Sequence, residues 1–156
     1  MARYRLPTKL AAYWATADPS VPAAPTQAEI GAAVDLIGSS SGEAVGELSG
    51  WAAQPNVVDT PDFTTNVVGN VAGDVTLPQS SMAFYSDDAS VVIYSALAPD
   101  TTGNVILGYE GSGVAKESQV FPARILSRER RADRGSAAMF DVAFTISPPT
   151  IGAFAA

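Results

Sequence analysis

Residues 80–97 have the sequence SSMAFYSDDASVVIYSAL, and this stretch contains the pattern on which the fold prediction rests. In an extended chain, its first part places Met82, Phe84 and Ser86 on one face and Ala83 and Tyr85 on the other, which indicates a strand. Asp87 and Asp88 then stop the strand, and either carboxylate can accept hydrogen bonds from the free amides that open a helix. The apolar residues that follow recur at helical spacing up to Pro99: Ala89, Val92, Ile93, Ala96 and Leu97. We therefore predict a strand followed by a helix over about residues 88–97.

The β-branched run at residues 91–93 prefers strands, so local propensity alone leaves helix and strand equally open there. The rest of the chain favours a short helix among strands. The 156 residues are 47% hydrophobic and include 13 glycines and 11 prolines, and long helical periodicities are absent. This composition predicts one folded domain over residues 1–156, mainly β, with one or two short helices.

Three further segments give local signals. Thr26 and Glu29 form a capping box, which predicts a short helix near residues 27–33. Residues 138–146 alternate between core-facing and outward-facing side chains, the clearest strand pattern in the chain. Residues 69–74, GNVAGD, are typical of the connection in a hairpin.

The two ends of the chain differ in character from the segment between them. We expect an N-terminal arm over about residues 1–9 and a C-terminal tail over about residues 147–156, which begins with Ser-Pro-Pro and so ends the last ladder. The tail contains two apolar side chains that could anchor it on a neighbouring subunit, Ile151 and Phe154.

The residue types disfavour catalysis. The chain has no cysteine and no histidine, so it lacks thiolates, the commonest general base and the commonest metal ligand. Asp59 and Asp62 flank Thr-Pro, and the proline removes the amide that glycine supplies in an aspartic-protease loop, which favours a turn. We predict that the protein is not an enzyme and needs no cofactor or metal. A carboxylate-dependent hydrolase is the least favoured alternative.

Charge is segregated along the chain. The net charge is −7, yet residues 10–115 contain twelve acids and no lysine or arginine, and the nine basic residues lie before residue 10 or between residues 116 and 134. This balance argues against binding nucleic acid by phosphate neutralisation. No segment approaches the ~18 apolar residues of a membrane span. The pattern indicates either a solvated acidic surface or opposing charged surfaces on a self-assembling subunit.

The sequence resembles the major tail tube proteins of long-tailed, non-contractile bacteriophages, particularly those of actinobacterial hosts. The resemblance covers nearly the whole chain and rests on the order and spacing of six motifs: PTQAEI at 25–30, DL at 35–36, VDTPDF at 58–63, SMAFYSDD at 81–88, VFPAR at 120–124 and FDVAFTI at 140–146.

The resemblance implies a β-sandwich or partly closed barrel with a flanking helix. It further implies six-membered rings that stack into a hollow tube, assembled in the bacterial host cytoplasm as part of the virion tail. The viral DNA would pass through without specific binding, and the partners would include a tape measure protein and tail-end or terminator proteins. Another virion structural subunit, such as a capsid decoration or tail terminator protein, is the alternative.

A channel for DNA must not hold it, because each phosphate neutralised by lysine or arginine adds affinity. Acids on or between strands in the region without basic residues are therefore the candidates for the lumen wall: Glu43, Glu47, Asp59, Asp62 and Asp74. The arginines are expected at contacts between subunits or rings, away from the lumen: Arg124, Arg128, Arg130, Arg131 and Arg134.

Overall fold

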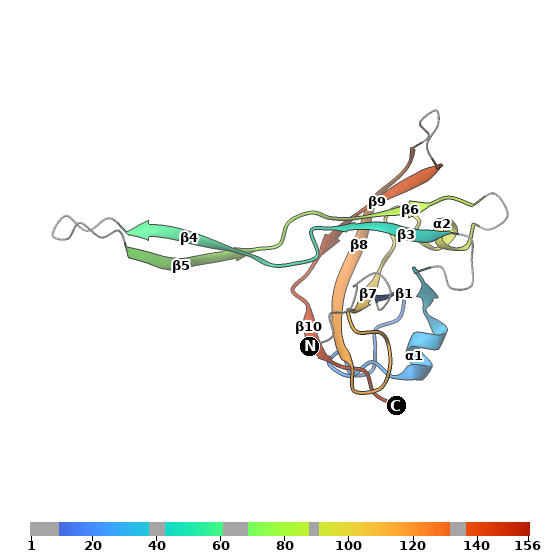
Figure 1. The fold of residues 1–156 in the computed structure, drawn as a ribbon, viewed down its shortest axis with the longest axis horizontal. Coiled ribbons are helices and arrows are strands. Elements are labelled where there is room, and N and C mark those ends of the chain that lie inside the picture. The colour runs from blue at the N-terminus through green and yellow to red at the C-terminus, as the bar shows by residue number, and fades with distance from the viewer. Residues whose placement is uncertain (1–9, 38–42, 61–68, 88–90, 132–136) are drawn as a thin grey trace, which may run out of the picture.

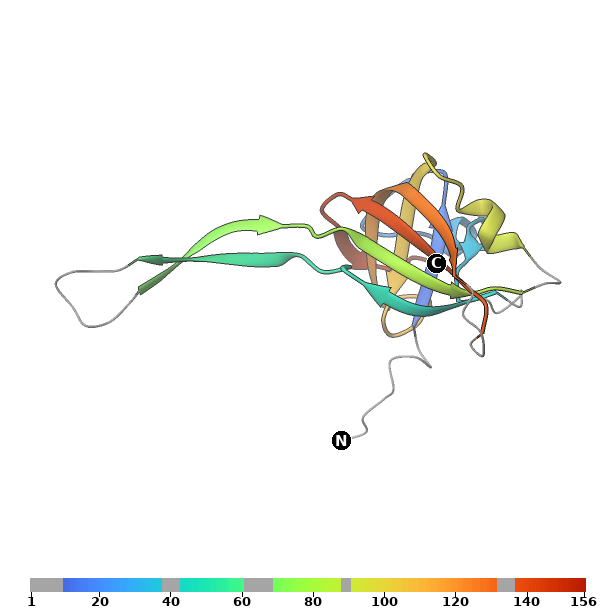
Figure 2. The same ribbon diagram turned by 90° about the horizontal axis from the view of Figure 1, so that it is seen from above.

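The structure is a computed structural model that describes residues 10–37, 43–60, 69–87, 91–131 and 137–156. It consists of a body, formed by one antiparallel sheet and two short helices, and a hairpin that extends far from the body (Figure 1). Figure 2 shows the same hairpin from above, again directed away from the sheet. The mainly β fold predicted from the sequence is confirmed.

The body sheet has the strand order β2-β1-β7-β8-β9-β6-β3, and β10 pairs with β8 beside β9. The sheet curls, and the amide of Val45 donates a hydrogen bond to the carbonyl oxygen of Leu36 at 3.1 Å, which links β3 to the residue after β2. The sheet is therefore partly closed without a continuous ladder around it. The bounds of its strands are β1 (Ala11–Ala15), β2 (Val34–Asp35), β3 (Ala44–Ser49), β6 (Ser80–Tyr85), β7 (Thr102–Gly108), β8 (Glu117–Arg131), β9 (Met139–Ile146) and β10 (Thr150–Ala153).

The core lies on the inner face of the curled sheet. Strand β9 shows how the sequence builds it: Phe140, Val142 and Phe144 are fully buried, and the residues between them are more exposed, as the alternation predicted. The indole of Trp51 packs edge-on against Phe144, with ring centres 5.2 Å apart. Such large, buried aromatic side chains contribute much of the hydrophobic stabilisation of a domain of this size.

A second, smaller cluster lies on the opposite face of the sheet. Ile106 of β7 and Val120 of β8 point to this face, because Val105, Leu107 and Phe121 beside them belong to the inner core. Ile30 of helix α1 (Gln27–Ala32) and Phe154 cover them. The helix and the C-terminal segment therefore bury part of the outer face.

Helix α1 begins where the capping box predicted it. The Thr26 hydroxyl accepts a hydrogen bond from the Glu29 amide at 3.3 Å, and the Glu29 carboxylate accepts one from the Thr26 amide at 2.8 Å. The Ser20 hydroxyl and amide also donate to this carboxylate. These bonds to Ser20 and Thr26, which favour the charged form, lower the pKa of Glu29 to about 2.

Helix α2 (Val92–Ala96) is shorter than predicted and is capped differently. The stretch is helical and not a strand, but its N-cap is Val91, whose side chain makes no capping bond. The carboxylate of Glu43, beside β3, accepts from the amide of Ile93 at 2.6 Å and from the amide of Tyr94 at 3.3 Å. The prediction that Asp87 or Asp88 caps this helix is therefore wrong for Asp87, and Asp88 lies outside the described residues.

The hairpin pairs β4 (Gln54–Thr60) with β5 (Gly69–Thr76). Its ladder runs from Gln54 opposite Thr76 to Thr60 opposite Gly69, with one register shift between Pro55 and Val57. The prediction of a connection at residues 69–74 is wrong, because these residues form most of a strand. The connection falls within residues 61–68, outside the described residues.

Candidate assembly surfaces

The described acids among the five proposed for a lumen wall are spread over the body sheet and the hairpin. Glu43 is 0% exposed and caps helix α2 inside its own subunit, so its prediction as a lumen residue is wrong. Glu47 is exposed on the edge strand β3. Asp74 is exposed on β5, Asp59 lies on β4 opposite Asn70, and Asp62 lies outside the described residues. The hairpin and the sheet edge are thus two separate acidic sites.

Four of the five predicted interface arginines lie along strand β8 and fall into two groups. Arg124 forms an ion pair with Asp100 at 2.9 Å, and Arg131 forms one with Asp141 at 3.0 Å. Each of these arginines is therefore at least partly neutralised within its own subunit. Exposed pairs of this kind contribute little to stability. Arg134 lies outside the described residues.

Arg128 and Arg130 form the second group, which we call the arginine pair. Their guanidinium carbons lie 3.7 Å and 4.3 Å from the centre of the Tyr94 ring. Arg128 also donates a hydrogen bond to the carbonyl oxygen of Tyr94. The Tyr94 ring is in turn fixed edge-on against Phe140, with ring centres 5.2 Å apart. Helix α2 therefore positions the arginine pair, a role for Tyr94 that the sequence analysis missed.

The C-terminal segment folds onto its own subunit. After Ser-Pro-Pro the ladder resumes, because β10 pairs with β8 from Thr150 opposite Val120 to Ala153 opposite Glu117. Phe154 is 2% exposed within the outer-face cluster, so its prediction as an anchor on a neighbour is wrong. Ile151 is 62% exposed and stays a candidate for such a contact.

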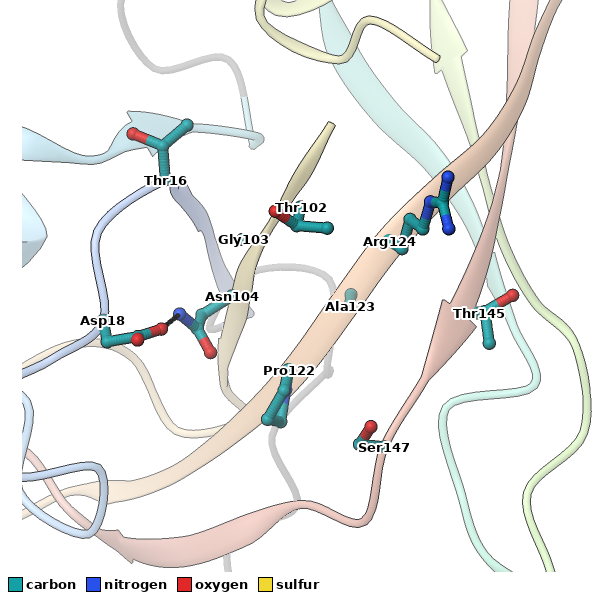
Figure 3. Close-up of a pocket in the computed structure, with 10 residues that line it drawn as sticks. All are labelled: Thr16, Asp18, Thr102, Gly103, Asn104, Pro122, Ala123, Arg124, Thr145 and Ser147. Atoms are coloured by element: carbon teal, nitrogen blue, oxygen red, sulfur yellow. Dashed lines mark hydrogen bonds between the residues drawn. The ribbon is translucent and has the colours of Figure 1, made fainter. Parts of the chain in front are cut away.

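An open cleft of about 410 Å³ lies on the outer face, where β1, β7, β8 and β9 approach one another (Figure 3). Asp18 and Asn104 point toward each other across one side of it and form a hydrogen bond of 2.7 Å, while Arg124 points away from them. Among its lining residues Asp18 is the one carboxylate, so the cleft does not offer the two facing acids of a carboxylate-dependent hydrolase.

Two features of the described residues bear on other classes of function. They contain no group of three or more acidic side chains placed to hold a metal ion together. No helix in the described part of the chain is long and apolar enough to cross a membrane.

A family model that matches most of the chain identifies its family. The family model described as phage tail tube protein matches residues 8–152. The chain belongs to the phage tail tube protein family. The resemblance to phage tail tube proteins is thereby confirmed, and this tail tube protein is a component of the virion tail. A search of curated protein sequences gives no significant match.

Solved structures with this fold come from related tubular assemblies. A chain of the tube terminator of an extracellular contractile injection system has a TM-score of 0.60 at 8% identity, covering 98% of this tail tube protein and 100% of that chain. A chain of the anti-feeding prophage cap, which terminates its tube, has a TM-score of 0.58 at 13% identity. The match covers 98% of this tail tube protein and 94% of the cap chain. A chain of the sheath–tube complex of the injection system has a TM-score of 0.55 at 7% identity, covering 93% and 88%. These likenesses show the fold.

Proposed function

We propose that this tail tube protein forms hexameric rings that stack into a hollow tube, through which the viral genome leaves. The β4–β5 hairpin is the observation that carries the proposal. A two-stranded hairpin is marginally stable in water by itself, and this one extends from the body (Figure 1) with Val75 64% exposed. A ribbon of this kind gains stability when it packs against a second copy of the chain. The length of an eight-residue strand, about 27 Å at ~3.4 Å per residue, lets it reach beyond its own subunit.

The ends of the body sheet support closure into a ring. Strands β2 and β3 are the last strands of the sheet path, and no ladder pairs them with each other, although the bond from Val45 to Leu36 links them at one point. Edge strands without a full ladder partner present backbone groups that pair readily with another chain. A head-to-tail contact that closes a ring covers such edges on every subunit. The number six comes from the family resemblance.

Repulsion between acids and DNA phosphates would keep the genome off the wall of the bore. At physiological salt this repulsion reaches about 8 Å, so it leaves the rest of the channel open. Glu47 is the lumen candidate on the body sheet. Asp59, Asp62 and Asp74 stay candidates for the wall of the bore, and a ring structure tests whether any of them reaches it.

The remaining parts of the proposal follow from the family. The protein has a structural role and no catalytic one, is assembled in the host cytoplasm, and meets the tape measure protein and the tail-end proteins during assembly. DNA passes without specific binding. A non-contractile tail stays a prediction from the sequence. A tube terminator is the second candidate function, because this protein shares its fold with the terminator and cap chains described above. A terminator would form single rings without open-ended stacking.

Replacing the hairpin by a short turn tests the proposal. Gln54 and Thr76 face each other in the ladder, so a two-residue Asn-Gly turn can join residues 53 and 77. We expect the shortened chain to keep the melting temperature of the body and to lose the large, concentration-dependent particles that the full chain forms in sedimentation. Particles of unchanged size from the shortened chain would refute the role of the hairpin. Only monomers or dimers from the full chain, with tail-initiation proteins supplied, would refute the assembly itself.

A further inference from the structure

Among the described residues, no acid of the same subunit forms an ion pair with the arginine pair. The structure describes three other basic residues, and each forms an ion pair within 4 Å. Lys116 pairs with Glu110, Arg124 with Asp100 and Arg131 with Asp141. Arg128 and Arg130 have no carboxylate at that distance among the described residues. Glu129 lies between them in sequence and therefore on the opposite face of the strand.

Two guanidinium groups held over one ring repel each other. Stacking on Tyr94 offsets part of this repulsion, because the ring face attracts cations. The rest is offset only when an anion binds, and a planar guanidinium is matched in shape to a carboxylate. The arrangement fixed by Tyr94 and Phe140 is therefore that of a preformed receptor for acidic groups.

The receptor is open to another molecule. Strand β7 pairs with β8 only over residues Gln119 to Arg124, so the second half of β8 lies beyond that neighbour. Arg130 is exposed, and Arg128 is partly exposed. A partner with carboxylates can reach the arginine pair without displacing any strand of the body.

The chain itself contains the complementary surface. Residues 54–76, which include both strands of the hairpin, carry three acids and no basic residue, and Asp74 is exposed among them. The hairpin also needs a partner of its own. We propose that the arginine pair binds the acidic β4–β5 hairpin of a second copy, with Asp74 among the carboxylates that it contacts. This inference rests on the proposed stacking function and names the surface that receives the hairpin.

A charge exchange tests the contact in the full-length chain. Asp74→Arg and Arg130→Asp each place like charges opposite each other, and each should raise the concentration needed for half-maximal assembly at least roughly tenfold. The double variant restores opposite charges and should return to within roughly threefold of the unchanged protein. Lys116→Asp, a charge reversal just before β8, is the matched control and should leave assembly within roughly twofold. Both substituted residues of the exchange are exposed, so melting temperatures should stay the same.

The outcomes separate this inference from the function on which it rests. If the full chain assembles and Arg130→Asp assembles equally well, the inference is wrong and the tube proposal stands. If both single variants fail and the double variant is not rescued, the two residues do not face each other and the inference is wrong as well. If Arg130→Asp instead abolishes binding of duplex DNA and leaves assembly unchanged, the pair binds phosphate and not the hairpin. If no variant and no unchanged chain assembles, both proposals fall together.

The absence of cysteine allows a second, direct measurement. Asp74→Cys and Arg130→Cys proteins, mixed under mild oxidation with an excess of the unchanged chain, should form disulfide-linked dimers. A disulfide requires Cα atoms within about 7 Å. Cross-linking of Asp74→Cys to Lys116→Cys at a similar yield would show that the contact is not specific.

Discussion

Replacing Glu43 by alanine should destabilise the body more than any other removal of a single acid from the described residues. Its carboxylate is fully buried and accepts hydrogen bonds from the amides of Ile93 and Tyr94, the second and third residues of helix α2. Glu43 thereby ties β3 to the helix, although fifty positions separate it from Ile93. The change removes this cap and leaves the amide of the fully buried Ile93 without its acceptor.

The expected loss can be estimated from the two bonds. A hydrogen bond to a charged group contributes about 1.5–3 kcal/mol. The bond to Ile93, at 2.6 Å, should be worth that much, and the bond to Tyr94, at 3.3 Å, clearly less. Loss of an ordinary N-cap costs about 0.5–2 kcal/mol, which gives a lower bound. We therefore expect a loss of about 2–4 kcal/mol, or a fall in melting temperature of roughly 4–16 °C at about 2–4 °C per kcal/mol.

Thermal unfolding followed by circular dichroism measures this change. Glu47→Ala is the matched control, because Glu47 is an exposed acid of the same segment and its removal should change stability by no more than about 0.5 kcal/mol. Glu43→Gln keeps one acceptor oxygen, so its melting temperature should lie between those of Glu43→Ala and Glu47→Ala. If Glu43→Ala melts within a degree or so of Glu47→Ala, the capping role assigned to Glu43 is wrong.

Three further predictions concern the helices and the C-terminal segment. Ile93→Ala should cost about 2–5 kcal/mol in denaturant unfolding because Ile93 is fully buried, whereas Val92→Ala, at an exposed position of the same helix, should cost little. Phe154→Ala should cost about 3–5 kcal/mol, and Ile151→Ala should leave stability unchanged; equal effects would mean that the segment does not pack as described. The pKa of Glu29 is lowered from 4.5 to about 2, so its stabilising contribution is complete above pH 4.5 and is lost as the pH falls toward 2. The difference in melting temperature between the unchanged protein and Glu29→Gln should shrink over that range, and NMR titration should place the Glu29 pKa near 2.

The parts of the fold that the sequence predicted are those that depend on near neighbours. The capping box needs residues three apart, and the alternation of β9 needs only one buried face, so both patterns appear directly in the sequence. The helix at α2 was harder, because its β-branched residues oppose its helical spacing. Its cap comes from Glu43, and no local pattern could indicate a bond across that distance.

In the hairpin and the C-terminal segment, local sequence signals gave wrong predictions. Residues 69–74 are rich in the residue types that favour turns, yet they form a strand. This strand packs on no body sheet, so it lacks the apolar alternation that marks a half-buried strand. The tail was expected to be free because Ser-Pro-Pro ends a ladder, whereas β10 resumes pairing with the same strand after the interruption.

The candidate assembly surfaces stay predictions, and the structure shows only where their described residues lie in the fold. The segregation of charge identified the arginines of β8 and the acids of the hairpin, because it can be counted along the sequence. The charge pattern did not show which arginines form ion pairs within the subunit and which stack on Tyr94. That distinction depends on Asp100 lying beside Arg124, Asp141 beside Arg131 and Tyr94 beside Arg128, and these contacts join distant parts of the sequence.

Electron cryomicroscopy of the purified chain, at rising concentration and with tail-initiation proteins supplied, tests the central claim most directly. Stacked rings with six subunits around an open bore, joined by hairpins that reach from one subunit to another, are the expected result. Isolated rings that never stack would favour a terminator. Particles without a bore, or monomers and dimers alone, would contradict the claim that this chain builds a tail tube.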